Sequence, residues 1–297
     1  MKRVFLLVAT NFGVMAVLFI TFNLIQAIFG ITIGGGSFTG IAITSLLFGF
    51  GGALISLWMS KGSAKRSMGV QIIEQPTNAQ ERWLVESVRA QADKSGIGMP
   101  EVGIFHSPSP NAFATGANRN NALVAVSQGL LDQMTPDEVE AVLGHEIGHV
   151  ANGDMVTQTL LQGVVNTFVF VLARIFGMLI SNLLSRGQGN GGYGMGYYLG
   201  STIAQVFLGF VASAIVMWFS RYREFHADKA GSDLAGREKM IAALRRLQMA
   251  SGEAPDMPGE MAAFGIFGLE VPGGLKRFFT THPPFCLLYT SPSPRDS

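Results

Sequence analysis

Long uncharged stretches alternate with charged ones along this chain. Residues 4–28 form a stretch of 25 without a charged side chain, and residues 31–60 form a glycine-rich one of 30. A helix of about 20 apolar residues crosses the hydrocarbon core of a bilayer, so either stretch is long enough to span it. A secretory signal peptide is the alternative for the first stretch, but its apolar part would be shorter and a cleavage site would follow. We predict that residues 1–60 form a retained transmembrane hairpin.

A second pair of apolar stretches follows later in the chain. Residues 155–184 carry Arg174 as their one charge, and residues 197–219 carry none. The glycine-rich residues 185–196 between them are typical of a flexible turn. Length favours a second transmembrane hairpin over residues 155–220, in which Arg174 must face protein or water. A helical hairpin buried in a soluble core is the alternative.

The charged sequence between the hairpins, residues 61–154, has the pattern of a small α+β fold. Residues 78–94 place apolar side chains at helical spacing. Turn-forming residues separate three short extended segments, namely residues 102–106, 111–115 and 121–127. We expect this region to be the first half of a catalytic domain. Residues 221–285, which open with a helix, are expected to form its second half.

Composition and charge restrict the class of protein. The chain is 48% hydrophobic and 14% charged, whereas a soluble domain has roughly 25% charged residues. The formal net charge of +1 gives no sign of a nucleic-acid partner. Positive side chains flank the first hairpin at Lys2, Arg3, Lys61, Lys65 and Arg66. The positive-inside rule therefore predicts that the N-terminus and the soluble domain are cytoplasmic.

Residues 145–149 read His-Glu-Ile-Gly-His, in a segment that has the start and stop signals of a helix. Thr135 and Glu138 have the spacing of a capping box, with Pro136 at the first helical position. Gly153 is placed to end the helix. Histidines four residues apart lie on one face of a helix, so both imidazoles can reach one cation.

This pattern is typical of a zinc peptidase. His145 and His149 would bind the ion, and Glu146 beside them would act as the base toward an attacking water. A catalytic zinc has three protein ligands and an open position, so we expect one Zn²⁺ per subunit and a third ligand elsewhere. The alternative is that these are ordinary helix residues. The pattern arises by chance in about one in a hundred chains of this length, so a match by itself needs support from a third ligand.

Glu224 is the best candidate for the third ligand, because we expect it to open a helix directly after the last apolar stretch. Asp228 lies one helical turn further on the same face and could accept a hydrogen bond from a ligating histidine. His226 points elsewhere, so we interpret it as a surface or packing residue. The alternative for Glu224 and Asp228 is a solvated helix face that pairs with Arg221 and Arg223.

Three segments together resemble the HtpX family of bacterial membrane proteases, whose wider group includes the CAAX prenyl proteases. They are the His-Glu-Ile-Gly-His helix, residues 221–228 (Arg-Tyr-Arg-Glu-Phe-His-Ala-Asp) and residues 111–116 (Asn-Ala-Phe-Ala-Thr-Gly). The resemblance extends to about residue 284. It implies a mainly α membrane protein with a zincin-like α+β domain, in which Glu224 completes the zinc site and Asn111 borders the cleft. It also implies a bacterial inner-membrane zinc endopeptidase that faces the cytoplasm and serves stress-linked quality control of membrane proteins.

The chain departs from the family pattern after Pro284, where the family continues into a charged helix. Residues 286–297 are a tail rich in serine and proline, which we interpret as artefactual, from a frameshift or an adapter sequence. His282 and Arg221 are candidates for a second group that stabilises the oxyanion. Membrane-protein or other polypeptide substrates would bind as a strand at the sheet edge. The bilayer is the other expected partner, and self-association into a homo-oligomer stays open.

Two other functions fit parts of the pattern. An intramembrane protease would place the His-Glu-Ile-Gly-His helix in the bilayer, but Asp137, Glu138 and Glu140 favour an aqueous helix. A scaffold without enzymatic activity would hold a structural metal or none, but a structural zinc site has four protein ligands. We expect the peptidase.

Overall fold

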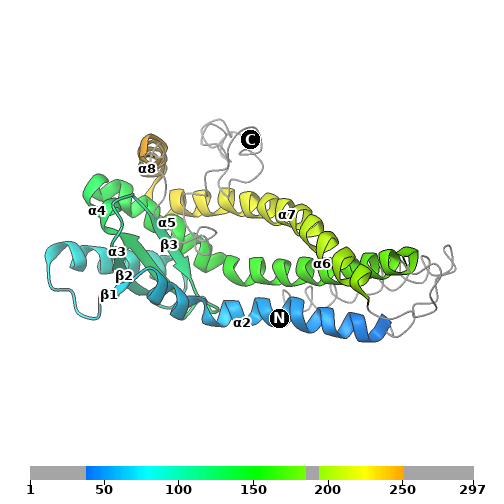
Figure 1. Cartoon of the computed structure of the whole chain (residues 1–297). Coiled ribbons are helices and arrows are strands. Elements are labelled where there is room, and N and C mark those ends of the chain that lie inside the picture. The colour runs from blue at the N-terminus through cyan, green and yellow to red at the C-terminus, as the bar shows by residue number, and fades with distance from the viewer. Residues whose placement is uncertain (1–37, 185–193, 251–297) are drawn as a thin grey trace. The chain divides into compact units, whose positions relative to one another are not determined.

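The computed structural model describes residues 38–184 and 194–250 (Figure 1). Helices form most of this part of the chain, together with one small sheet. The elements are α2 (Phe38–Ser67), β1 (Gln71–Ile72), α3 (Ala79–Ser95), β2 (Glu101–Phe105), β3 (Ala112–Thr115), β4 (Leu123–Ser127), α4 (Gln128–Gln133), α5 (Pro136–Asn152), α6 (Asp154–Leu184), α7 (Met195–Ala235) and α8 (Arg237–Ala250). The predicted span over residues 4–28, most of the linker 185–196, His282 and the tail 286–297 lie outside the described residues.

The helix α5, which carries the His-Glu-Ile-Gly-His run, begins and ends where its sequence signals predict. The Thr135 N–H donates to the Glu138 carboxylate at 2.8 Å, and the Glu138 N–H donates to the Thr135 hydroxyl at 3.4 Å. These two bonds form the capping box, with Pro136 directly after the cap. Gly153 ends the helix in the left-handed conformation, with φ 66°, which glycine adopts without steric cost.

The four strands form one sheet in the order β1-β2-β4-β3. β2 and β4 are parallel, whereas β1 pairs antiparallel with β2 and β3 pairs antiparallel with β4. The three extended segments predicted from the sequence are β2, β3 and β4, with slightly shifted bounds. The sequence pattern does not predict β1, because two residues are too few to show an alternation.

Different helices cover the two faces of this sheet (Figure 1). On one face Val102 and Val124 belong to a core that includes buried residues of α3, α5 and α8. On the other face Phe105 and Phe113 pack with Ala64, near the end of α2. Successive side chains of a strand point to opposite faces, so β2, β3 and β4 contribute to both cores. The packing of α3, α8 and the sheet around α5 explains why its histidines are buried.

The helices α2, α6 and α7 are each long and apolar enough to cross a membrane. α7 differs from the prediction, because the helix expected to begin near Arg221 is the continuation of the apolar helix that starts at Met195. The sequence changes from apolar to charged residues after Phe219, but no proline or helix-ending glycine lies between Phe219 and Arg221. The helix backbone therefore continues without a break. A helix of 41 residues is about 60 Å long, which is roughly twice the hydrocarbon core.

The described chain divides into two compact units. One, here called the apolar unit, contains residues 38–56, 159–184 and 194–216, which are the apolar parts of the long helices. The other, here called the charged unit, contains residues 57–158 and 217–250, which are the sheet, the shorter helices and the charged ends of the long helices.

The apolar unit is packed through small residues, as is common between membrane helices. A Cβ added to Gly163 would lie 2.9 Å from the Phe50 ring, and one added to Gly177 would lie 2.8 Å from the Ser201 side chain. Arg174 faces protein, as predicted, because its guanidinium donates to the Ser45 hydroxyl at 3.0 Å. Ser45 is completely buried.

Candidate metal centre

Two helices of the charged unit bring together the three residues predicted to bind zinc. His145 and His149 lie on adjacent turns of α5, and Glu224 lies on α7. The two Nε2 atoms are 3.1 Å apart. Glu224 Oε2 is 3.4 Å from Nε2 of His145 and 3.6 Å from Nε2 of His149. All three side chains are buried, so the solvated face considered for Glu224 is wrong.

The size of this triangle matches a metal site. Zinc ligand atoms at 2.0–2.1 Å in a tetrahedron lie roughly 3.3–3.4 Å apart, close to the separations between His145, His149 and Glu224. Two imidazoles and one carboxylate are also the donor set of known catalytic zinc sites. The residues present therefore fit a zinc ion with one open position.

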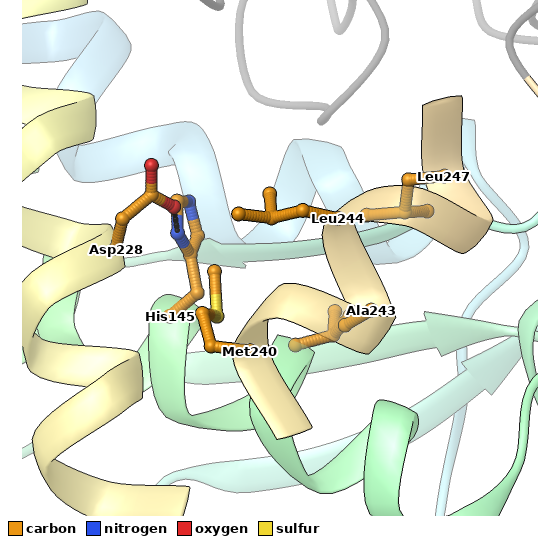
Figure 2. Close-up of a pocket in the computed structure, with 7 residues that line it drawn as sticks. His145, Asp228, Met240, Ala243, Leu244 and Leu247 are labelled. Atoms are coloured by element: carbon orange, nitrogen blue, oxygen red, sulfur yellow. Dashed lines mark hydrogen bonds and ion pairs between the residues drawn. The ribbon is translucent and has the colours of Figure 1, made fainter. Parts of the chain in front are cut away.

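Each imidazole has a carboxylate on its other nitrogen. Asp228 Oδ1 is 2.8 Å from Nδ1 of His145 (Figure 2), and Asp154 Oδ2 is 2.7 Å from Nδ1 of His149. Such a partner orients the ring and directs its Nε2 toward the metal. The contact of Asp228 agrees with the sequence analysis, but Asp154 was missed. Its signal is weak, since only the reversal of the chain at Gly153 brings the first residue of α6 back to His149.

Arg223 is a second residue that the sequence analysis did not assign to the site. It is 6% exposed, so it does not lie on a solvated face. Its guanidinium donates to the Asp154 main-chain carbonyl at 3.0 Å and also to the Gln158 side chain. Arg223 therefore ties α7, the helix of Glu224, to the first turn of α6, which carries the carboxylate partner of His149.

α5 and α7 approach each other closely at small residues. Gly144 and Gly148 each directly precede a histidine, and they face Ala227, Ala230 and Gly231 of α7. A Cβ added to Gly148 would lie 2.7 Å from the Cβ of Ala230, and one added to Gly144 would lie 3.2 Å from the Cα of Gly231. Glycine at these positions lets the two helix backbones come near enough for the carboxylates of α7 to reach the imidazoles of α5.

The carboxylates determine the charge of the imidazoles. Burial by itself would lower the pKa of His145, but the hydrogen bonds and charges of Asp228 and Glu224 outweigh it and raise this pKa well above its ordinary value. Burial likewise opposes protonation of His149, whereas Glu224 and Asp154 raise its pKa to about 9. Without a metal the histidines are therefore protonated beside the carboxylates. The site thus favours positive charge, whether protons or a metal ion supply it.

Glu146 lies beside the histidines on α5 and is 3% exposed. Burial raises the pKa of its carboxyl, while the charges of His145 and His149 and a hydrogen bond from the Ala114 main chain act in the opposite direction. Ala114 is part of β3, so the candidate base contacts the edge strand of the sheet. A raised carboxyl pKa suits a group that must both accept and return a proton.

The other predicted residues occupy different positions. Asn111 is buried directly before β3, and its N–H donates to the Ser127 hydroxyl at 2.9 Å. Arg221 is half-buried on the same α7 turn as Glu224. His226 is exposed, and its ring nitrogen bonds the Tyr222 carbonyl at 3.0 Å, as expected for a histidine outside the site. The roles of Asn111 and Arg221 stay predictions, as does that of His282.

Comparison with known proteins adds an independent result. The model of peptidase family M48 matches residues 78–286. The protease HtpX homolog of Thiobacillus denitrificans is 54% identical over 284 residues, which are 96% of this chain and 96% of that protein. Protease HtpX of Aliivibrio fischeri strain MJ11 is 52% identical over 287 residues, again 96% of each chain.

A solved structure shares the fold. The crystal structure of S. mikatae Ste24p matches with a TM-score of 0.59 and 17% identity, over 92% of this chain and 65% of that chain. The family resemblance predicted from the sequence is thereby confirmed. The chain belongs to peptidase family M48 and, within it, to the HtpX proteases, and it is a membrane metalloprotease.

Proposed function

We propose that this chain is a zinc-dependent endopeptidase of the bacterial inner membrane, with a cytoplasmic active site, that cleaves misfolded or damaged membrane proteins in stress-linked quality control. The observation that carries the proposal is the buried triangle of His145, His149 and Glu224, with Glu146 beside it. Its dimensions suit three ligands of one tetrahedral zinc. Zinc in such a site lowers the pKa of a water molecule and polarises the carbonyl of the scissile peptide bond.

The side chains of this chain have distinct roles in the proposal. Glu146 takes the proton of the attacking water and returns it to the leaving amine. Asp228 contacts Nδ1 of His145 at 2.8 Å, and Asp154 contacts Nδ1 of His149 at 2.7 Å. These contacts orient the two imidazoles so that the Nε2 atom of each would bind the ion. The burial of all these groups keeps bulk water away from the charges, which strengthens their interactions.

The substrate is proposed to bind as an extended strand along β3. This strand is at the edge of the sheet, and Ala114 joins it to Glu146 through a main-chain hydrogen bond. A peptide paired with β3 would therefore pass beside the candidate base, and main-chain pairing demands little of the substrate sequence. Ala112 and Ala114 are at most 1% exposed. The atoms that cover β3 must therefore move aside before a substrate strand can pair with it.

The location in the membrane rests on the charges that flank the long helices. Lys65 and Arg66 are in the last turn of α2, and the positive-inside rule assigns such residues to the cytoplasm. The charged unit follows directly in sequence. The curated relatives are named proteases of bacteria, in keeping with the inner membrane.

Glu146→Gln tests the enzymatic role. The amide keeps the size of the side chain and cannot act as the base, while the proposed ligands are unchanged. We expect the purified protein in detergent to hold its normal zinc content and to lose at least about 10²-fold in activity. A zinc-loaded variant with full activity would exclude Glu146 as the base.

A cysteine introduced at Ser63 tests the orientation. Ser63 lies near the charged C-terminal end of α2. Cys286 is first changed to serine so that the introduced cysteine is the one thiol that can react. An impermeant thiol reagent added to cells with a permeabilised outer membrane should leave this cysteine unlabelled, and should label it once the inner membrane is broken. Labelling from the outside would place the metal centre in the periplasm.

A further inference from the structure

Arg174 is a charged side chain inside a candidate membrane span. It lies on α6, about 22 Å along the helix from Thr159 and about 15 Å from Leu184, at 1.5 Å per residue. The helix between these two residues carries no other charge. A hydrocarbon core of about 30 Å centred on this stretch therefore contains Arg174. Ionisable residues at such depth are unfavourable in free energy, and those that persist mark binding sites and pathways.

The charge of Arg174 has no counterion in the apolar sequence. Residues 1–60 and 155–219 contain no aspartate or glutamate. In the described part of the chain, the hydrogen-bond partner of its guanidinium is the neutral Ser45 hydroxyl, at 3.0 Å. A guanidinium has five N–H donors, so Ser45 occupies one of them and leaves the positive charge uncompensated.

Ser45 fixes the guanidinium at the contact of α6 with α2 and leaves its other donors accessible. Ser45 is completely buried, whereas Arg174 is half-buried. Among the described residues, Arg223 has a nitrogen that is both buried and without a partner, but Arg174 has none. The donors of Arg174 that Ser45 does not use therefore lie at the surface of the apolar unit, where another helix in the bilayer can reach them.

A tie between α2 and α6 does not by itself account for a charge at this position. A glutamine amide can donate the same hydrogen bond to Ser45 without placing a charge in hydrocarbon. Lipid phosphates are anions too, but they lie outside the hydrocarbon core, whereas Arg174 is near the middle of its span. The ligand that fits is a carboxylate that is itself inside the membrane.

We propose that Arg174 binds an aspartate or glutamate in the transmembrane helix of a substrate. This inference rests on the proposed peptidase function and deepens it, because it names a substrate class: membrane proteins with a helix that exposes an acidic side chain to lipid. In a correctly folded membrane protein such a residue is paired inside the helix bundle. Its exposure therefore distinguishes a misfolded or unassembled chain from a native one.

Binding at Arg174 would hold the substrate on the protease and raise the effective concentration of its soluble segments at the metal centre. The contact is made in the bilayer and is the same before and during peptide hydrolysis. It should therefore lower KM for membrane substrates and leave kcat unchanged. Soluble polypeptides have no such helix, so their cleavage should not depend on Arg174.

The test measures binding in lipid vesicles, separately from proteolysis. All proteins carry Glu146→Gln so that bound peptides are not cut, and energy transfer between labelled protein and labelled peptide gives the dissociation constant. The peptides have one apolar span of about 20 residues, with aspartate, asparagine or leucine near its centre. The protein with Arg174 should bind the aspartate peptide about 5- to 30-fold more tightly than the leucine peptide, the strength of a polar pair between membrane helices.

Substitutions separate a counterion from a helix tie. Arg174→Gln keeps a donor for Ser45 without the charge and should abolish the preference for aspartate. Arg174→Lys keeps the charge and should retain the preference, and so should Ser45→Ala, which removes the tie alone. Arg119→Gln, in the exposed turn before β4, is the matched control for the loss of an arginine.

Equal binding of the three peptides would overturn the inference, and this result needs no variant of Arg174 that must fold. A loss of preference in Ser45→Ala as large as in Arg174→Gln would reduce Arg174 to a helix tie. Binding that follows the content of anionic lipid and ignores the residue in the peptide would assign Arg174 to lipid headgroups and overturn the inference as well. If the zinc-loaded protein with Glu146 cleaves no polypeptide while the preference for aspartate holds, the proposed function fails and the binding site stands.

Discussion

Gly148→Ala is the sharpest test of how the metal centre is assembled. Alanine is ordinarily better than glycine inside a helix by about 1 kcal/mol, so with free space this substitution would stabilise α5. Here the new Cβ would lie 2.7 Å from the Cβ of Ala230, whereas carbon atoms in contact need about 3.5–4.0 Å. α5 and α7 must therefore separate by roughly 1 Å at this level.

A shift of that size is large for a metal site. Glu224 is on the displaced helix, at 3.4 and 3.6 Å from the two Nε2 atoms, and metal–ligand distances tolerate only about ±0.2 Å. We expect the zinc affinity of Gly148→Ala to fall by about 10- to 100-fold, the range seen when groups that orient ligands are changed. Overpacking should also lower the free energy of unfolding by about 1–3 kcal/mol.

The assay measures the zinc dissociation constant by competition with a chelator, together with thermal unfolding. Gly209→Ala is the matched control, because a Cβ at Gly209 meets no atom within 4 Å. The double variant Gly148→Ala with Ala230→Gly removes the opposing methyl group, and the remaining contacts of the new Cβ with Ala227 are ordinary ones of 3.4 and 3.5 Å. Zinc affinity should recover in the double variant. Wild-type affinity in the single variant, or no recovery in the double one, would refute the argument.

Three further predictions concern the same centre. Glu224→Ala leaves two histidines, so bound zinc measured by elemental analysis should be lost, and full occupancy would exclude Glu224 as a ligand. Asp154→Asn removes the charge beside His149 and should weaken zinc binding by about 10- to 100-fold, whereas Asp132→Asn, on the exposed part of α4, should leave the zinc dissociation constant unchanged. Because the pKa of His149 is raised to about 9 in the metal-free site, protons compete with zinc below that pH. Affinity should therefore rise about tenfold per pH unit between pH 6 and 8 for each proton displaced, and an affinity independent of pH would contradict the charge state described here.

The family membership bears on the alternative functions considered from the sequence. A scaffold without activity is no longer needed to explain the metal cluster, since the chain is a metalloprotease. The candidate spans among the described residues are α2, α6 and α7.

Local sequence by itself determined the helix that carries the histidines. Thr135, Pro136, Glu138 and Gly153 act within one or two turns, through hydrogen bonds and backbone conformations that need no distant partner. The four-residue spacing of His145 and His149 is likewise local, since it follows from the pitch of an α-helix. The length of the apolar stretches also predicted candidate membrane helices, because a span depends on the number of consecutive apolar residues.

Tertiary structure alone decided the contacts of Asp154 and Arg223 and the close packing of α5 against α7. Asp154 is near His149 only because the chain reverses at Gly153, and Arg223 is buried only because α7 packs against the start of α6. Gly148 has no special role in an isolated helix, and its importance comes from Ala230 on a helix far away in the sequence. Such contacts depend on the distance between two helix axes. The period and the caps of each helix carry no information on that distance, because packing of the whole domain determines it.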